Sequence, residues 1–338
     1  MKREKFVSKA DRYVNFPQAL LILQILSSVM ILHEGFENLD LGNPVVTLGI
    51  FDGVHRGHRT LLDRLVLSAK ESKGESVVIT FSPHPRLVLD RNRKKLSFLT
   101  TMEEKVTLLE MTNIDHLVIV EFTKKFSRMP ACHFIKEVLV KKIGTRHLII
   151  GYNHHFGRNG EGDYSTIKQC TESLDFIVDQ VQGFQTGEGA VSSSLIRDAL
   201  LNGMLDDANN WLGYYYSLSG TIIKGRQIGR TIGFPTANIK PDYQYKLIPG
   251  NGVYAVEVKL DRATYPGMMS IGSNPTVNND PGKRSIEVNI LNFTGDIYGR
   301  TISVVFRKRL RDEIKFDNTA QLAEQIKLDK QQVLQLLA

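Results

Sequence analysis

The chain has 338 residues, of which 42% are hydrophobic and 23% charged, with 43 Lys and Arg against 36 Asp and Glu. These ordinary fractions exclude a disordered, collagen-like or disulfide-dense protein, and the length suggests two domains. Cys132 and Cys170 fit no metal-ligand spacing, which favours a reducing compartment and predicts a cytoplasmic location. The net charge of +7 suits phosphate-rich small ligands or RNA about equally.

Residues 1–29 are predicted to be an amphipathic appendage or a start-codon extension, with the compact protein beginning near Met30. The apolar run at 19–32 is interrupted by Gln24 and two serines and is too short to cross a bilayer. A mixed-charge lead precedes it and no small-residue cleavage site comes before Pro44, so it is a poor signal peptide. We therefore expect no association with a membrane.

Residues 45–179 alternate short β-branched runs with helical patterns. The runs lie at 45–48, 77–81, 117–120, 147–150 and 176–178. Near-continuous apolar strands that alternate with helices are typical of a parallel sheet covered on both faces. The sequence thus predicts a Rossmann-like α/β domain, whose ligands gather at the carboxyl ends of the strands.

A glycine- and histidine-rich turn follows the first of these runs, over 49–58. Its glycines let the backbone turn tightly, and the helix that follows offers unpaired N–H groups to an anion. His55 and His58 fall on one face of that helix, where both rings can donate hydrogen bonds to a triphosphate. The further candidate nucleotide contacts here are Gly49, Phe51, Asp52, Gly53 and Gly57. Alternatives are a plain surface turn or a zinc site made by the two histidines and Asp52, which lacks a further ligand.

A serine-capped helix offers a second clamp on the same nucleotide. Ser192, Ser193 and Ser194 supply hydroxyl groups at its start, and Arg197 lies in its first turn. Helices capped by serine are common, so this segment indicates a site only together with the glycine–histidine turn.

The hydrophobic pattern of the sequence changes from about residue 214 onward. Period-two patterns at 253–258 and 286–290, broken by glycine and asparagine turns, predict antiparallel strands that form a small barrel. Two helical stretches are predicted over 319–337. We place the domain boundary near Gly213, after a helix that contains Trp211.

Residues 220–238 combine a glycine-rich basic loop with an extended tail. The loop's candidate nucleotide contacts are Gly225, Gly229, Arg230 and Gly233. Pro235 favours an extended backbone, in which Thr236 and Asn238 point the same way. Their side-chain oxygens are hard ligands that suit Mg²⁺.

Glu287 lies in a strand whose aliphatic residues alternate with polar ones. Ile286 and Val288 face one side, so Glu287 faces the other, away from the aliphatic core. Taken alone, it is a solvated strand glutamate more often than a catalytic group.

Several motifs occur in the order found in prokaryotic bifunctional riboflavin kinase/FAD synthetases, and the chain resembles that family from Met30 to its C-terminus. These motifs are the glycine–histidine turn, 81–85, 98–101 with 103–105, 151–153 with 156–157, the serine-rich run at 192–197, and the Pro-Thr-Ala-Asn segment at 235–238. The resemblance implies an N-terminal nucleotidyltransferase domain (30–212), which moves AMP from ATP to FMN. It also implies a C-terminal antiparallel β-barrel riboflavin kinase domain with terminal helices (213–338).

The resemblance also assigns roles to residues. In the first domain His55 and His58 would contact the ATP phosphates, and Arg197 would neutralise charge as pyrophosphate leaves. The flavin side would be lined by Asn153 and by Pro83, His84 and Pro85. No strong base is required there, because the attacking FMN phosphate is already ionised.

In the second domain the resemblance makes Glu287 the base for the riboflavin 5′-hydroxyl, with Mg²⁺ held by Thr236 and Asn238. Arg311, in the basic segment 307–311, would lie near the flavin phosphate, or equally be part of a solvated strand end. The expected ligands are thus ATP, riboflavin, FMN and FAD.

The sequence departs from the family pattern at three places. Ser194 and Leu195 replace Thr-Arg, Asn153 precedes His154 and His155 where Asp and Phe-Arg are usual, and Asn289 stands where many relatives carry His. One alternative is accordingly a riboflavin kinase whose first domain binds nucleotide unproductively. Another is an RNA-binding or regulatory protein, but with 8% aromatic residues and dispersed charge no nucleic-acid partner is expected.

Overall fold

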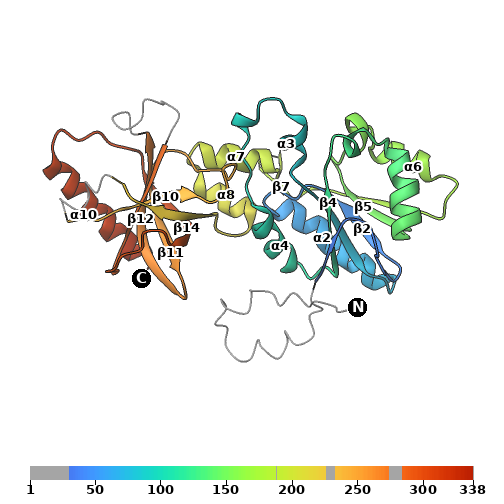
Figure 1. Cartoon of the computed structure of the whole chain (residues 1–338), viewed down its shortest axis with the longest axis horizontal. Helices are drawn as coiled ribbons and strands as arrows, with labels where there is room; N and C mark the ends of the chain where they lie inside the picture. The colour runs from blue at the N-terminus through green and yellow to red at the C-terminus, as the bar shows by residue number, and fades with distance from the viewer. Residues whose placement is uncertain (1–29, 188, 226–232, 274–283, 338) are drawn as a thin grey trace.

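A computed structural model of the chain describes residues 30–187, 189–225, 233–273 and 284–337. Two folded halves lie side by side along the long axis of the molecule, with the parallel sheet in one and the barrel in the other (Figure 1). The predicted extension 1–29 lies outside the described residues. Within the described ranges, no helix is both long and apolar enough to cross a membrane.

The first half is built on a six-stranded sheet in which every neighbouring pair is parallel, as predicted. Its strands are β1 (Ile31–Glu34), β2 (Val45–Leu48), β3 (Ser76–Ser82), β4 (His116–Glu121), β5 (His147–Gly151) and β6 (Ile177–Val181), in the order β1-β4-β3-β2-β5-β6. The central strands are buried along nearly their whole length, because helices cover both faces.

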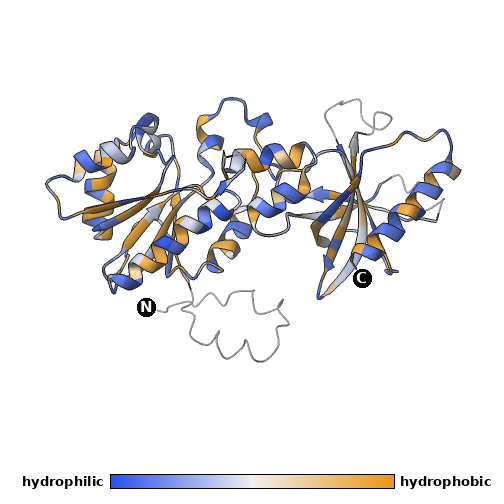
Figure 2. Cartoon of the chain, turned by 180° about the vertical axis from the view of Figure 1, so that it is seen from behind, coloured by the Kyte–Doolittle hydropathy of each residue, from blue (hydrophilic) through white to orange (hydrophobic). Residues whose placement is uncertain are grey.

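The two faces of the sheet carry separate cores. One packs under α2 (Arg56–Glu71) and α4 (Met102–Glu110), and the other under η5 (Phe134–Ile143), a π-helical segment, and α6 (Tyr164–Thr171). Figure 2 shows the apolar strands between helices that turn their polar faces outward. Short helices α3 (Pro85–Leu89) and α5 (Ala131–His133) precede the longer ones, and the pair β7 (Gln185–Thr186) and β8 (Gly189–Ala190) precedes α7 (Ser193–Leu201) and α8 (Leu205–Leu212).

The two cysteines are joined as a disulfide bond, which the sequence analysis did not predict. Cys132 lies in α5 and Cys170 in α6, 38 residues apart, with Cα atoms separated by 5.4 Å. A single pair at this separation has no sequence signature, because only the fold decides whether two cysteines come within bonding geometry.

The second half is a closed antiparallel barrel, which confirms the predicted class. It comprises β9 (Ser217–Ile223), β10 (Ala237–Pro241), β11 (Gly252–Leu260), β12 (Ala263–Ser273), β13 (Arg284–Ile290) and β14 (Thr301–Arg311), in the order β10-β13-β12-β11-β14-β9. The two predicted terminal helical stretches are wrong in number: α10 (Thr319–Leu336) is one helix. Its sequence holds neither glycine nor proline to interrupt it.

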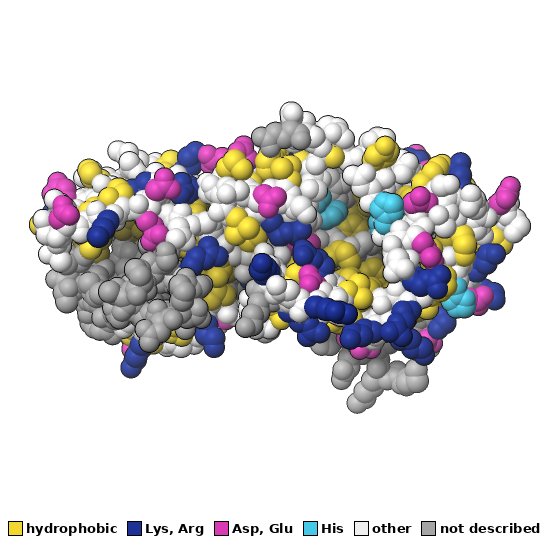
Figure 3. Space-filling view, turned by 90° about the horizontal axis from the view of Figure 1, so that it is seen from above, with side chains coloured by type: hydrophobic (Ala, Val, Ile, Leu, Met, Phe, Trp, Pro, Cys, Tyr) yellow, Lys and Arg dark blue, Asp and Glu magenta, His cyan; other side chains and the backbone are white. Residues whose placement is uncertain are grey.

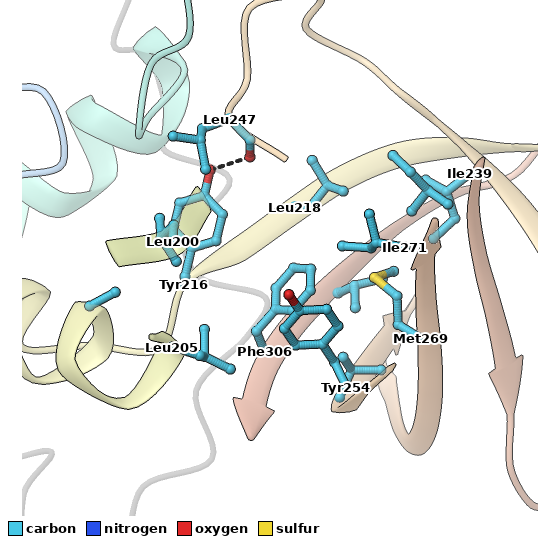
Figure 4. Packing of buried hydrophobic residues seen from close by; sticks show 14 of the residues in the cluster. Leu200, Leu205, Tyr216, Leu218, Ile239, Leu247, Tyr254, Met269, Ile271 and Phe306 are labelled. Atoms are coloured by element: carbon cyan, nitrogen blue, oxygen red, sulfur yellow. Dashed lines mark hydrogen bonds between the residues drawn. The ribbon is translucent and has the colours of Figure 1, made fainter. Parts of the chain in front are cut away.

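One apolar core joins the barrel to α7 and α8. Leu200 and Leu205 pack in the same cluster as Tyr254 and Phe306, and the Tyr216 hydroxyl donates to the Leu247 carbonyl at 2.6 Å (Figure 4). The proposed boundary follows the end of α8, where Gly213 adopts a φ of 77°. Because the core crosses that point, the two halves are held together by more than the chain connection.

Candidate functional sites

The predicted glycine–histidine turn connects β2 to α2 at the carboxyl end of the sheet. His55 is the N-cap of α2, and its Nδ1 accepts a hydrogen bond from the His58 backbone N–H at 3.3 Å. Gly53 has a φ of 85°, and a Cβ there would lie 2.7 Å from a Leu99 methyl group. A Cβ on Gly57 would lie 3.1 Å from the Val191 carbonyl oxygen. The positive φ favours glycine at position 53, and a side chain at position 57 would crowd the Val191 carbonyl oxygen, in agreement with the close backbone approach that the sequence predicted.

The rings of His55 and His58 stack with their centroids 3.6 Å apart. Burial, aided by the nearby Arg197 charge, lowers the pKa of His55 to about 4. Burial and the charges of His55 and Lys105 hold the pKa of His58 well below its usual range. Both rings are therefore neutral near pH 7, and each can donate one ring N–H to an anion without itself carrying charge.

Asp52 holds parts of this site together. Its carboxylate, in a residue that is 4% exposed, accepts hydrogen bonds from the backbone N–H groups of Leu99 and Thr100 at 2.9 and 3.1 Å. It also forms an ion pair with Arg197 at 2.9 Å. Asp52 thus positions Arg197. A direct contact between Asp52 and a nucleotide stays a prediction. Its engagement also removes support for the zinc alternative, and the described ranges hold no cluster of three His, Cys, Asp or Glu able to bind a metal.

The serine-capped helix does reach the same point. Ser192 is the N-cap of α7, and Ser193 Oγ donates to the Asp52 carbonyl oxygen at 2.9 Å. Arg197 donates to Ser194 Oγ at 3.1 Å. The structure therefore brings together two segments 141 residues apart that the sequence had linked only by hypothesis. Phe51, by contrast, is 2% exposed and packs against the His58 ring, so its side chain supports the site from within the protein.

A cavity of about 630 Å³ opens beside this site. Its lining is largely aromatic and includes Phe81, Phe122, Phe126, Phe134 and Phe156. Figure 3 shows a hollow in this half of the molecule, with hydrophobic side chains on its floor and histidines at its rim. The sequence analysis missed the phenylalanines that follow β4, although three of them within thirteen residues after a buried strand were a usable signal.

The residues predicted to line the flavin side only partly meet this cavity. Pro85 is among its lining residues, whereas Asn153 is exposed and is not. His155 and Phe156, which were not predicted to contact the flavin, also line it. His84 caps α3 and stacks on Phe98 with 4.0 Å between ring centroids. Burial and nearby cations lower the pKa of His84 to about 3. Pro83, which precedes it, is likewise not part of the lining.

In the barrel, Glu287 lies beside the predicted metal ligands. Thr236 Oγ1 donates to Glu287 Oε2 at 3.1 Å, and Asn238 is the register partner of Glu287 across β10 and β13. Ile286 and Val288 are buried at 4% and 0% exposure, which confirms the predicted alternation.

Two further contacts shape this site. Asn289 Nδ2 donates to the Pro235 carbonyl oxygen at 2.6 Å and so fixes the start of the segment that carries Thr236. A Cβ on Gly225 would lie 2.0 Å from Asn238 Nδ2, so the backbone at Gly225 lies directly against that amide. Gly233 adopts a φ of 83°. Gly229 and Arg230 lie outside the described residues.

Arg311 has a partner within the protein, which neither of its two predicted roles included: a place near the flavin phosphate or at a solvated strand end. Its guanidinium forms hydrogen bonds of 2.7 to 3.2 Å with the carboxylate of Asp329, which is 2% exposed in α10. This ion pair fastens α10 to the barrel, so the strand end is not simply solvated. Contact between Arg311 and a flavin stays a prediction.

Comparisons with known proteins agree over both halves. The FAD synthetase family model matches residues 38–195, and the riboflavin kinase family model matches residues 212–337. A bifunctional riboflavin kinase/FMN adenylyltransferase from Listeria monocytogenes is 37% identical over 289 residues, 86% of this chain and 91% of that protein. The protein of the same name from Escherichia coli K12 is 37% identical over 287 residues, 85% of this chain and 90% of that one.

The crystal structure of a macrolide-efflux protein from Streptococcus pneumoniae is similar, with a TM-score of 0.80 and 30% identity. The similarity covers 90% of this chain and 98% of that one, so the arrangement of both halves is shared. Two family models in this order, and relatives that span most of the chain, lead to one conclusion. The chain belongs to the bifunctional riboflavin kinase/FMN adenylyltransferase family, with a FAD synthetase domain followed by a riboflavin kinase domain.

Proposed function

We propose that this chain makes FAD in two steps, phosphorylating riboflavin at Glu287 and adenylylating FMN at the His55–His58 turn. The observation that carries the proposal is the presence of two separately built sites in one chain. In the first, neutral histidines and Arg197 converge at the carboxyl end of a parallel sheet. In the second, a carboxylate stands beside the hydroxyl of Thr236.

In the kinase step, Glu287 would accept the proton of the riboflavin 5′-hydroxyl as that oxygen attacks the γ-phosphorus of ATP. An alcohol is a poor nucleophile until it loses its proton, so this step needs a base. Thr236 donates to one carboxylate oxygen and thereby holds the group in place, which leaves the other oxygen to take the proton. The new bond joins the 5′-oxygen to phosphorus, and ADP leaves with the electrons of the broken bond.

The residues of this site suit a magnesium ion. Thr236 and Asn238 present a hydroxyl and an amide oxygen next to the Glu287 carboxylate, and Mg²⁺ prefers hard oxygen donors of this kind. When bound, Mg²⁺ would offset the negative charge of the polyphosphate. Gly225, at the start of the glycine-rich segment, lies directly against the Asn238 amide.

In the adenylyltransferase step, an oxygen of the FMN phosphate would attack the α-phosphorus of ATP. His55 and His58 would donate N–H groups to phosphate oxygens, and Arg197, fixed by Asp52, would balance charge on the departing pyrophosphate. Neutral histidines suit this role, because each keeps one ring N–H as a donor through the physiological pH range.

The aromatic cavity is the proposed place of the flavin ring. Its volume of about 630 Å³ and its phenylalanine lining suit a flat, largely apolar heterocycle. We expect Phe156 and Pro85 to contact the ring, with Asn153 outside the first layer of contacts. Residues 30–212 and 213–338 would be the two functional domains, working in the cytoplasm and without a nucleic-acid partner.

Separating FMN and FAD by HPLC after incubation with riboflavin, ATP and Mg²⁺ tests the proposal. The wild-type protein should form both products. Glu287→Gln should stop FMN formation yet still convert supplied FMN to FAD, and His58→Ala should do the reverse. FMN without FAD from the wild type would show a kinase with an idle first domain, and loss of both activities in a folded single variant would refute the separation of the sites.

A further inference from the structure

Two lysines of this protein are almost fully buried, and only one of them is satisfied. Lys246, which follows β10, is 6% exposed and donates to the Leu99 carbonyl oxygen at 2.7 Å and to Glu104 at 2.5 Å. Lys105, in α4, is 4% exposed. Within the described ranges, no hydrogen bond or ion pair with the protein holds its ammonium, and that nitrogen is not among the fully enclosed unpaired atoms, so it retains some access to solvent.

The placement of Lys105 is costly in two ways. An ammonium group on a residue this buried loses most of its hydration, and a cation near the first turn of a helix opposes the helix dipole. Lys105 and Leu109 are the buried residues of α4, one turn apart, so they lie on the face that packs into the domain. A polar position on this face that has no partner points to a ligand that supplies one.

The groups around Lys105 identify where that ligand would lie. The Lys105 charge depresses the pKa of both His58, in α2, and His84, which precedes α3. The charge of Asp52 acts on Lys105, but that carboxylate is already bonded to Arg197 and to the backbone of Leu99 and Thr100. The Lys105 ammonium thus lies near the histidines of this site. A second cation there, the Arg197 guanidinium, is already paired with Asp52.

We propose that Lys105 binds the ATP polyphosphate in the adenylyltransferase site and stabilises the negative charge of the pyrophosphate as it leaves. This inference rests on the adenylyltransferase function proposed above. In the step, the bond between the α-phosphorus and its bridging oxygen to the β-phosphate breaks, and the electron pair leaves with pyrophosphate. The FMN phosphate oxygen forms the new bond. Lys105 keeps its proton throughout and acts only as a charged donor.

The pKa of Lys105 provides a second line of support. Desolvation lowers it from its ordinary value to about 8, despite the opposing effect of Asp52. The free enzyme therefore begins to lose this charge slightly above physiological pH. If the ammonium binds polyphosphate, ATP affinity must fall over the same interval, because only the protonated form attracts the anion.

The test uses the full chain with FMN and ATP, so that FAD formation does not depend on the kinase site. The variants are Lys105→Met, Lys105→Arg and the control Lys136→Met, which changes an exposed lysine of the same domain. For Lys105→Met we expect the KM for ATP and the inhibition constant of inorganic pyrophosphate to rise by about 10- to 100-fold. Lys105→Arg should retain pyrophosphate inhibition, and Lys136→Met should match the wild type.

The pH profile separates a ligand from a packing role. Between pH 7 and 9, kcat/KM for ATP should fall in the wild type but stay flatter in Lys105→Arg, whose guanidinium remains protonated. Unchanged pyrophosphate inhibition in folded Lys105→Met would overturn the inference, as would pH profiles that coincide in wild type and Lys105→Arg. Should Lys105→Met fail to fold, the comparison with Lys105→Arg decides. Absence of FAD from the wild type would instead refute the underlying adenylyltransferase function.

Discussion

Asp52→Asn should uncouple Arg197 from the adenylyltransferase site while leaving the kinase site intact. The Asp52 and Arg197 side chains are 5% and 17% exposed. Asparagine preserves the shape but removes the charge. With its oxygen accepting from the backbone N–H groups of Leu99 and Thr100, its NH2 group faces the Arg197 guanidinium, so that two donors oppose each other.

The cost can be worked from these contacts. Removing one partner of a buried ion pair costs about 3–5 kcal/mol, and the partial exposure of Arg197 favours the lower limit, about 3 kcal/mol. For a domain of this size that corresponds to a fall in melting temperature of about 6–12 °C. A displaced Arg197 should also lower kcat/KM for FAD formation by about 100-fold.

Thermal unfolding and HPLC separation of FAD formed from supplied FMN measure both effects. FMN formation from riboflavin in the same preparation serves as the internal reference. Asp63→Asn, which changes an exposed carboxylate of α2, is the matched control and should behave as the wild type. A wild-type melting temperature together with undiminished FAD formation in Asp52→Asn would show that the ion pair neither stabilises the domain nor positions Arg197.

The other expectations concern the loop of the kinase site, the contact between the domains, and acid stability. Gly225→Ala places a methyl group against Asn238 and should lower the rate of FMN formation by about 10-fold or more. A titration with Mg²⁺ should show that this variant requires a higher Mg²⁺ concentration. An unchanged Mg²⁺ requirement would count against Asn238 as a ligand. Lys246→Met leaves Glu104 without its partner, so the free energy of unfolding in urea should fall by about 3 kcal/mol, with FAD formation more affected than FMN formation. Because the pKa of His55 is about 4 in the folded protein, the unfolded chain takes up a proton there first as the pH falls below 6.5, and this residue alone should weaken folding by about 1.4 kcal/mol per pH unit down to about pH 4. Urea midpoints at pH 7 and 4.5 check this, and His55→Gln should show a smaller decrease than the wild type.

The parts of this protein that were predictable depend on short stretches of sequence. The parallel sheet follows from apolar runs that alternate with helical periodicity, and the barrel follows from period-two patterns. The glycine–histidine turn was recognisable because glycine positions and histidine spacing are local. The face to which Glu287 points likewise follows from strand alternation alone.

The parts that were missed depend on distance across the fold. Asp52 finds its backbone partners 47 and 48 residues further along the chain, and Lys246 meets Glu104 across 142 residues. The same holds for the disulfide between Cys132 and Cys170 and for the ion pair that takes up Arg311.

Local stretches of sequence are enough to tell which chemical groups this protein carries and on which kind of element each one sits, because periodicity and turn chemistry act over a few neighbouring residues. Which of those groups are already bonded, and which remain available, depends on the three-dimensional fold. Asp52 and Lys246 have their partners within the protein, whereas Lys105, equally buried, has none in the described ranges. The physical reason is that a charge's availability depends on what surrounds it in space, and those surroundings come from segments far apart in the chain.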